Sequence, residues 1–124
     1  MRYNQSSEDY LETILLLSGE LEDVHQIEIA RSMQVSQPAV KKALKHLMAS
    51  GYIQMDGLHV NLTAKGKEYA NVVYARHCTI KNFLVMHGVG EDDAEKDACS
   101  MEHVISPQTV QMMEKYVSDC AQTK

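Results

Sequence analysis

Three side chains able to bind a metal ion lie close together near the C-terminal end of the sequence. Cys99, Glu102 and His103 provide a thiolate, a carboxylate and an imidazole at positions i, i+3 and i+4, a spacing that places side chains on one face of an α-helix. Together they offer soft and hard donors to a first-row divalent cation. A single helix leaves the coordination shell incomplete, so further ligands must come from elsewhere in the chain.

Suitable oxygen and nitrogen donors occur in two other predicted helices. Asp9 and Glu12 lie at i and i+3, so both carboxylates can point at one site, and His77 lies on a long central helix. Each residue also has an ordinary explanation: acids in a first turn oppose the helix dipole, a lone histidine usually packs, and a cysteine can be a small buried hydrophobe. Their joint occurrence favours one metal site, built from Asp9, Glu12, His77, Cys99, Glu102 and His103.

The elements that must position these residues are predicted to be mainly α-helical. Helical spacing of apolar residues predicts helices over 7–20, 24–33, from the Ser36-Gln37-Pro38 turn to Gly51, over 64–87, from residue 91 through the Cys99 triplet, and over 107–120. Asp56-Gly57 between two short apolar runs, 52–55 and 59–62, is typical of a tight β-hairpin. This order predicts a winged helix-turn-helix domain over 1–63 and a helical domain over 64–124.

The predicted second helix of the helix-turn-helix has a basic outer face. The net charge of −5 argues against indiscriminate nucleic-acid binding, yet no acid occurs from Ile29 to Met55. Such a helix enters the major groove with its first turn facing the base edges. The alternative is a basic solvated face in another kind of three-helix domain, but the hairpin follows at the spacing of a wing. The predicted DNA contacts are Ser36, Gln37, Pro38, Ala39, Lys41 and Lys42.

The composition limits the cellular setting. No apolar run approaches the roughly 20 residues of a membrane-spanning helix, and the first residues lack the apolar core of a signal peptide. Cys78, Cys99 and Cys120 form an odd set, which indicates reduced thiols rather than a disulfide framework. We therefore expect a cytoplasmic protein that has neither a membrane partner nor an organic substrate.

Four motifs carry a resemblance to a known family. They are Glu8-Asp9-Tyr10-Leu11-Glu12, Leu62-Thr63-Ala64-Lys65-Gly66, Arg76-His77 with Phe83-Leu84, and Cys99-Ser100-Met101-Glu102-His103-Val104-Ile105-Ser106. Over nearly its whole length the chain resembles the diphtheria toxin repressor family of metal-dependent transcriptional regulators, and is most similar to the short, two-domain manganese transport regulators. The resemblance implies that the six predicted ligands fall on the family's metal-binding positions. It also implies a homodimer formed by the helices after the wing, bound to a two-fold-symmetric DNA operator.

Two positions bear on which metal is bound. By this resemblance, residue 99 is glutamate in the manganese-responsive branch and cysteine in the iron-responsive branch, whereas Asp9 is typical of the manganese branch. Lys81 and Glu95 stand where the iron branch has the glutamate and histidine of an ancillary site. Because a thiolate favours a borderline ion over hard Mn2+, we predict an Fe2+ sensor with Mn2+ as the alternative. Zn2+ or Co2+ can substitute in vitro.

The predicted function is repression of metal-uptake genes when the ion is plentiful. The ion would draw the first helix toward the dimerisation helices and fix the two reading heads about 34 Å apart, one turn of the duplex. One alternative is a redox-sensing regulator that uses the Cys99 thiol. Another is a small metalloenzyme, although the sequence contains no nucleophile elbow, phosphate loop or HExxH pattern.

Overall fold

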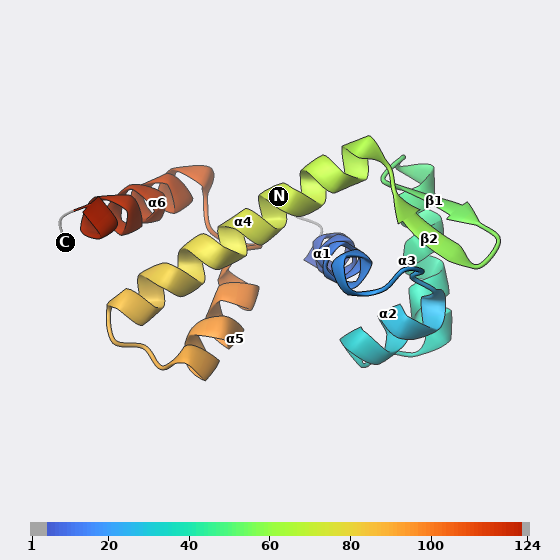
Figure 1. Cartoon of the computed structure of the whole chain (residues 1–124), viewed down its shortest axis with the longest axis horizontal. Coiled ribbons are helices and arrows are strands. Elements are labelled where there is room, and N and C mark those ends of the chain that lie inside the picture. Colours follow the sequence, from blue (N-terminus) through green and yellow to red (C-terminus); the bar gives the residue numbers. More distant parts are fainter. Residues whose placement is uncertain (1–4, 123–124) are drawn as a thin grey trace. The chain divides into compact units, whose positions relative to one another are not determined.

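The computed structural model describes residues 5–122. They form two compact units that divide within one long helix, after Val72. The described residues contain six helices and a two-stranded sheet, which are labelled in Figure 1. They confirm the predicted mainly α-helical, winged architecture. No helix in residues 5–122 is long and apolar enough to cross a membrane.

The first unit, up to Val72, is a helix-turn-helix with a wing. It contains α1 (Gln5–Glu20), α2 (Gln26–Met33), α3 (Gln37–Ala49), β1 (Ile53–Asp56) and β2 (His59–Leu62). Apolar side chains from all five elements form one core, and each contributes about 1.5–3 kcal/mol by leaving water. Its most completely buried members are Leu11, Ile14, Ile29, Val40, Leu47, Ile53 and Val60.

Local capping explains where α3 begins. The Ser36 hydroxyl accepts a hydrogen bond from the Ala39 N–H at 3.2 Å, and Pro38 occupies the first helical turn, where its missing N–H costs little. The Gln26 side-chain amide donates to the Gln37 carbonyl at 3.2 Å and so ties α2 to the start of α3. The predicted cap is therefore confirmed.

The start of α2 differs from the sequence prediction. The predicted helix began at Val24, whereas α2 begins at Gln26, after His25 in an extended conformation. The reason is tertiary: the Val24 carbonyl accepts a hydrogen bond from the Val60 N–H of β2 at 2.8 Å, so this segment extends along the sheet. At its other end α2 stops at Gln34, whose φ of 57° lies in the left-handed region.

Two glycines allow the tight turn of the wing and the close packing of the start of α4 (Ala64–Met86). β1 and β2 pair in antiparallel register from Ile53 with Leu62 to Asp56 with His59. Gly57, in the turn, has a φ of +63°, which confirms the predicted hairpin. Gly66, in the first turn of α4, lies so near Tyr52 that a Cβ at residue 66 would collide with the Tyr52 carbonyl oxygen.

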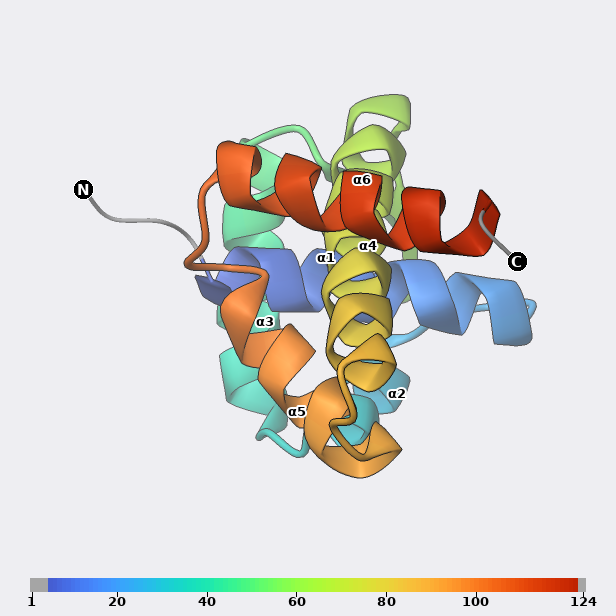
Figure 2. The same ribbon diagram turned by 90° about the vertical axis from the view of Figure 1, so that its left-hand side faces the viewer.

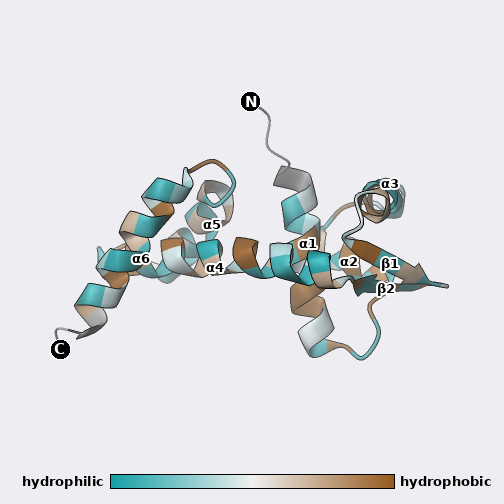
Figure 3. Ribbon diagram, turned by 90° about the horizontal axis from the view of Figure 1, so that it is seen from above, coloured by the Kyte–Doolittle hydropathy of each residue, from teal (hydrophilic) through white to brown (hydrophobic). Residues whose placement is uncertain are grey.

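The second unit, from Val73 onward, consists of the rest of α4 together with α5 (Glu91–Met101) and α6 (Pro107–Gln122). Figure 2 shows α6 crossing α4. Ile80, Ala98 and Met113 form the buried cluster shared by the three helices. Along α4 and α6, hydrophobic and hydrophilic residues alternate (Figure 3), as expected for helices with one packed and one accessible face. The predicted start of α6 is confirmed, because the Thr109 N–H donates to the Ser106 hydroxyl at 3.2 Å.

Candidate metal centre and nucleic-acid interface

The sequence predicted that Cys99, Glu102 and His103 lie on one helix. In the structure only Cys99 lies within α5. α5 ends at Met101, and Glu102 is its C-cap with helical backbone angles (φ −58°, ψ −23°). The chain then turns, and the N–H groups of Val104 and Ile105 both donate to the Met101 carbonyl. The turn allows Ile105 to pack against the Ile80 cluster. His103 therefore projects from the turn rather than from α5.

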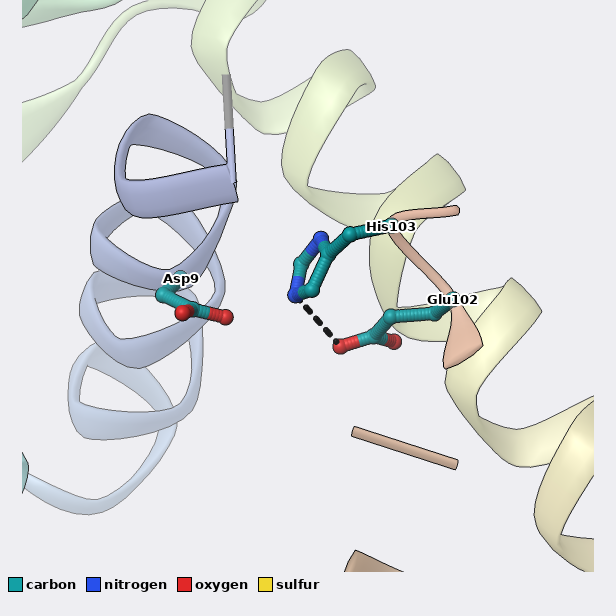
Figure 4. A group of neighbouring side chains, drawn as sticks. All are labelled: Asp9, Glu102 and His103. Atoms are coloured by element: carbon teal, nitrogen blue, oxygen red, sulfur yellow. Dashed lines mark ion pairs between the residues drawn. The ribbon is translucent and has the colours of Figure 1, made fainter. Parts of the chain in front are cut away.

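Glu102 is the centre of the candidate metal site. Its side chain is fully buried, with Oε2 3.5 Å from His77 Nδ1 and Oε1 3.4 Å from His103 Nε2. The second contact is the dashed line in Figure 4. Within the described residues neither Glu102 oxygen accepts a hydrogen bond. Because a buried carboxylate is costly unless it is compensated, and because carboxylate and imidazole suit divalent cations, these residues fit a metal ion.

A chain of polar contacts holds His77 from its other side. His77 Nε2 lies 2.8 Å from Glu95 Oε2, and Lys81 Nζ lies 3.2 Å from Glu95 Oε1 and 3.7 Å from Glu91 Oε1. Donating a hydrogen bond to the Glu95 carboxylate raises the pKa of Lys81, which keeps the ammonium charged. With Nε2 engaged by Glu95, the Nδ1 of His77 is the nitrogen that faces Glu102. Such a carboxylate behind a histidine fixes the ring orientation of a metal ligand.

Sequence reasoning named Lys81 and Glu95 but missed their contacts with His77 and Glu91. The sequence did contain a signal. His77 and Lys81 on α4, and Glu91 and Glu95 on α5, each lie at i and i+4, a spacing that places both side chains of a pair on one helix face. Two such faces on neighbouring helices can pair with each other.

The other predicted ligands differ in their surroundings. Cys99 is exposed on α5, in contrast to the buried His77, Glu102 and His103. Asp9, drawn in Figure 4, and Glu12 belong to α1 of the first unit, where Glu12 is buried and Asp9 is partly exposed. The roles of all six residues as metal ligands remain predictions.

The predicted DNA-binding surface is accessible. Val40, Leu44 and Leu47 pack one side of α3 into the core, and the opposite side carries three lysines. A helix with this division can present its outer face to a duplex. All six predicted contacts are exposed: Ser36, Gln37, Pro38, Ala39, Lys41 and Lys42.

Both units match domains of a known family. Residues 3–58 match the N-terminal DNA-binding domain of the iron-dependent repressors, and residues 63–123 match their metal-binding and dimerisation domain. The chain therefore belongs to the iron-dependent repressor, or diphtheria toxin repressor, family of metal-dependent DNA-binding transcriptional regulators. Its relatives include transcriptional regulators named MntR and the manganese regulator SloR.

Individual relatives support this assignment. The chain is 39% identical over 104 residues to the transcriptional regulator MntR of Escherichia coli O157:H7, covering 83% of this chain and 67% of that protein. It is 33% identical over 117 residues to an HTH-type transcriptional regulator of Methanocaldococcus jannaschii, covering 92% and 94% of the two chains. The solved structure of the manganese regulator SloR has 32% identity and a TM-score of 0.81, covering 95% of this chain and 55% of that one.

The chain spans about two thirds of the length of the MntR relatives and about half of the solved manganese regulator SloR. These relatives are transcriptional regulators, which confirms the expectation that the chain is a regulator and not an enzyme.

Proposed function

We propose that this protein represses metal-uptake genes as a homodimer on a two-fold-symmetric DNA operator, in response to Mn2+ or Fe2+ in the cytoplasm. The observation that carries the proposal is Glu102, a fully buried carboxylate between two imidazoles whose oxygens accept no hydrogen bond within the described residues. A divalent cation would compensate this buried charge. The position of Glu102 at the C-terminal end of α5, where the helix dipole is negative, further favours a cation.

Oxygen donors from α1 would complete the shell. We propose that Asp9 and Glu12 bind the same metal centre as His77, Cys99, Glu102 and His103. α1 belongs to the helix-turn-helix unit, so ion binding would restrain that unit relative to the dimerisation helices. A dimer held with its two α3 helices about 34 Å apart matches one turn of DNA. Couplings of this kind amount to about 1–3 kcal/mol per site.

The identity of the ion is best supported as Mn2+, with Fe2+ second, which reverses the order predicted from Cys99. SloR, whose solved structure matches 95% of this chain, is a manganese regulator. Three of the proposed ligands, Asp9, Glu12 and Glu102, are carboxylates, and carboxylates suit hard Mn2+. The soft donor Cys99 is exposed, so the buried part of the candidate centre contains only oxygen and nitrogen donors.

Accessible apolar side chains on the second unit support a homodimer. Near the end of α4, Val85 and Met86 are exposed, as are Met112 and Tyr116 of α6. The Phe83 and Tyr116 rings lie 5.4 Å apart, so these side chains come from packed neighbouring helices. A cluster of exposed apolar residues of this kind is typical of a protein interface.

Operator binding measured against metal concentration tests the function. A fluorescent operator, selected from random duplexes with the Mn2+-loaded protein, is titrated with protein in Mn2+, in anaerobic Fe2+ and in excess chelator. We expect tight binding with metal and a loss of about 5- to 150-fold with chelator. Glu102→Gln should abolish the metal response, whereas Asp92→Asn, which removes an exposed acid from the same helix, should preserve it. Binding that is equally tight in chelator would refute the proposal.

A substitution at Cys99 tests both the ligand set and the choice of ion. Cys99→Glu should strengthen the Mn2+ response relative to Fe2+, because it replaces a soft donor with a hard one. Ser100→Ala, at the exposed neighbouring position, is the control. An unchanged Mn2+ to Fe2+ ratio would mean that Cys99 is not a ligand. Loss of DNA binding on peroxide treatment in the presence of chelator would instead support the redox alternative.

A further inference from the structure

Two histidines outside the Glu102 centre face each other beside the turn of the wing. His25, just before α2, and His59, the first residue of β2, are direct partners in an isolated antiparallel β-bridge. Directly opposed residues of this kind place their Cβ atoms about 4.5–5.5 Å apart on the same face. The two ring centroids lie 4.7 Å apart, with an angle of 76° between the rings. Backbone pairing therefore brings two imidazoles together on one face.

A carboxylate lies behind each ring. His59 Nδ1 is 3.0 Å from Asp23 Oδ1, and His25 Nδ1 is 3.4 Å from Glu28 Oε1. Glu28 is itself held in place, because the same oxygen accepts a hydrogen bond from the His25 backbone N–H at 2.7 Å. In the neutral tautomer that places the proton of each ring on Nδ1, facing its carboxylate, the lone pair is on Nε2. Metal-binding histidines characteristically donate their other ring N–H to a carboxylate in this manner.

We propose that His25 and His59 form a second metal site that binds Cu2+ or Zn2+ through their Nε2 atoms. Imidazole is a preferred ligand of both ions, whereas Mn2+ prefers oxygen donors, so this site would differ in selectivity from the Glu102 centre. The His25 and His59 side chains are 34% and 40% exposed, which gives an ion access and leaves room for water to complete the shell. Asp23 and Glu28 supply negative charge beside it.

An ion at this position would link two parts of the DNA-binding unit. His25 precedes the first helix of the helix-turn-helix, and His59 follows the turn of the wing. The Val60 N–H donates to the Val24 carbonyl at 2.8 Å between the same two segments. Metal bound to both rings would therefore reduce local opening of the wing. This inference is independent of the proposed repressor function.

Cu2+ titration of the full chain, followed by electron paramagnetic resonance, tests the site. We use the Glu102→Gln background, which removes the central carboxylate of the other centre. In this background we expect one Cu2+ with hyperfine coupling to two imidazole nitrogens. Adding His59→Gln should weaken Cu2+ binding by more than about tenfold and remove one coupling, and Asp23→Asn should weaken it by about tenfold.

His46→Gln, at an exposed histidine on α3 of the same unit, is the matched control and should leave the Cu2+ spectrum unchanged. Circular dichroism checks that each variant is folded. The proposal is overturned if His59→Gln retains the affinity and both couplings, or if His46→Gln loses as much as His59→Gln. As a second readout, Zn2+ should slow amide exchange of residues 56–60 in the Glu102→Gln background, and a failure to do so after Zn2+ binding at His25 would refute the link to the wing.

Discussion

The two units of this protein differ in the kinds of side chain that they bury. The first unit has a broad apolar core, and its buried Glu8 is satisfied by a 2.7 Å hydrogen bond from the Tyr69 hydroxyl. The second unit has the small apolar cluster around Ile80, and it buries His77, Glu102 and His103 as well. Hydrophobic burial alone can therefore stabilise most of the first unit. Stability of the second unit should depend on a cation, because its buried carboxylate has no hydrogen bond within the described residues.

The largest effect should come from the apolar core of the first unit. Leu47 is 1% exposed. The substitution Leu47→Ala should lower the free energy of unfolding by about 2–5 kcal/mol, because it leaves a cavity. Urea denaturation with and without Mn2+ measures the loss, which should be the same in both. Met48→Ala, at an exposed neighbour, should cost less than about 0.5 kcal/mol. Full rescue of Leu47→Ala by metal would contradict the separation between the units.

Metal removal should act mainly on the second unit. The free energy of opening measured at the amides of α5 and of the following turn should rise by about 2.7 kcal/mol when Mn2+ is present at one hundred times its dissociation constant. The amides of α3 should change less, because α3 itself carries no proposed ligand. Hydrogen exchange with mass spectrometry, in Mn2+ and in chelator, measures both regions. Equal protection of α3 and α5 would remove the proposed difference.

A smaller effect should follow from loosening His77. Glu95→Gln keeps the size of the side chain but removes the carboxylate that faces His77 Nε2 at 2.8 Å and Lys81 at 3.2 Å. Mn2+ affinity, measured by isothermal titration calorimetry, should fall by about 10- to 100-fold, as for other groups that orient a metal ligand. Asp92→Asn, on the same helix, should leave it unchanged. Equal affinities of Glu95→Gln and the parent would show that Glu95 does not position His77.

The smallest effect should be a gain of stability in the first unit. Gln34 has a φ of 57°, and a left-handed conformation costs a residue other than glycine about 1–2 kcal/mol. Part of this is offset by the extra chain entropy that glycine loses on folding, so Gln34→Gly should stabilise the unit by up to about 1 kcal/mol. Thermal denaturation in chelator measures it. Arg31→Gly, within α2, is the control and should destabilise by about 1 kcal/mol; a loss at position 34 would mean that the Gln34 side chain matters more than its backbone.

Much of the fold was predictable because its signals are local. Ser36 before Pro38, and Asp56-Gly57 between two apolar runs, specify a helix start and a hairpin without reference to distant residues. The end of α5 at Met101 and the start of α2 at Gln26 were missed, because they depend on packing of Ile105 and on pairing of Val24 with β2. Neither contact is visible in the neighbouring sequence.

The candidate site likewise has residues that local spacing predicts and contacts that only the packing of helices determines. Spacing along the chain predicted that Glu102 and His103 act together, and the structure brings Glu102 close to both His103 and His77. The contacts of Glu95 with His77 and Lys81 depend on how α4 and α5 pair across their loop. Candidate ligands were thus easier to name from the sequence than the residues that would orient them, because ligands must be particular residue types whereas the residues behind them need only the right position.

The glycine at position 66 changes how one of the sequence motifs is understood. Leu62-Thr63-Ala64-Lys65-Gly66 was among the signatures that pointed to the family, yet Gly66 faces the Tyr52 carbonyl with no space for a side chain. The Thr63 N–H also donates to that carbonyl, at 3.0 Å, and the Thr63 hydroxyl donates to the Gly51 carbonyl at 2.7 Å. This signature therefore marks a joint where two stretches of main chain touch. A sequence motif that is typical of a family of regulators can therefore reflect how the main chain packs, and not only which ligand the protein binds.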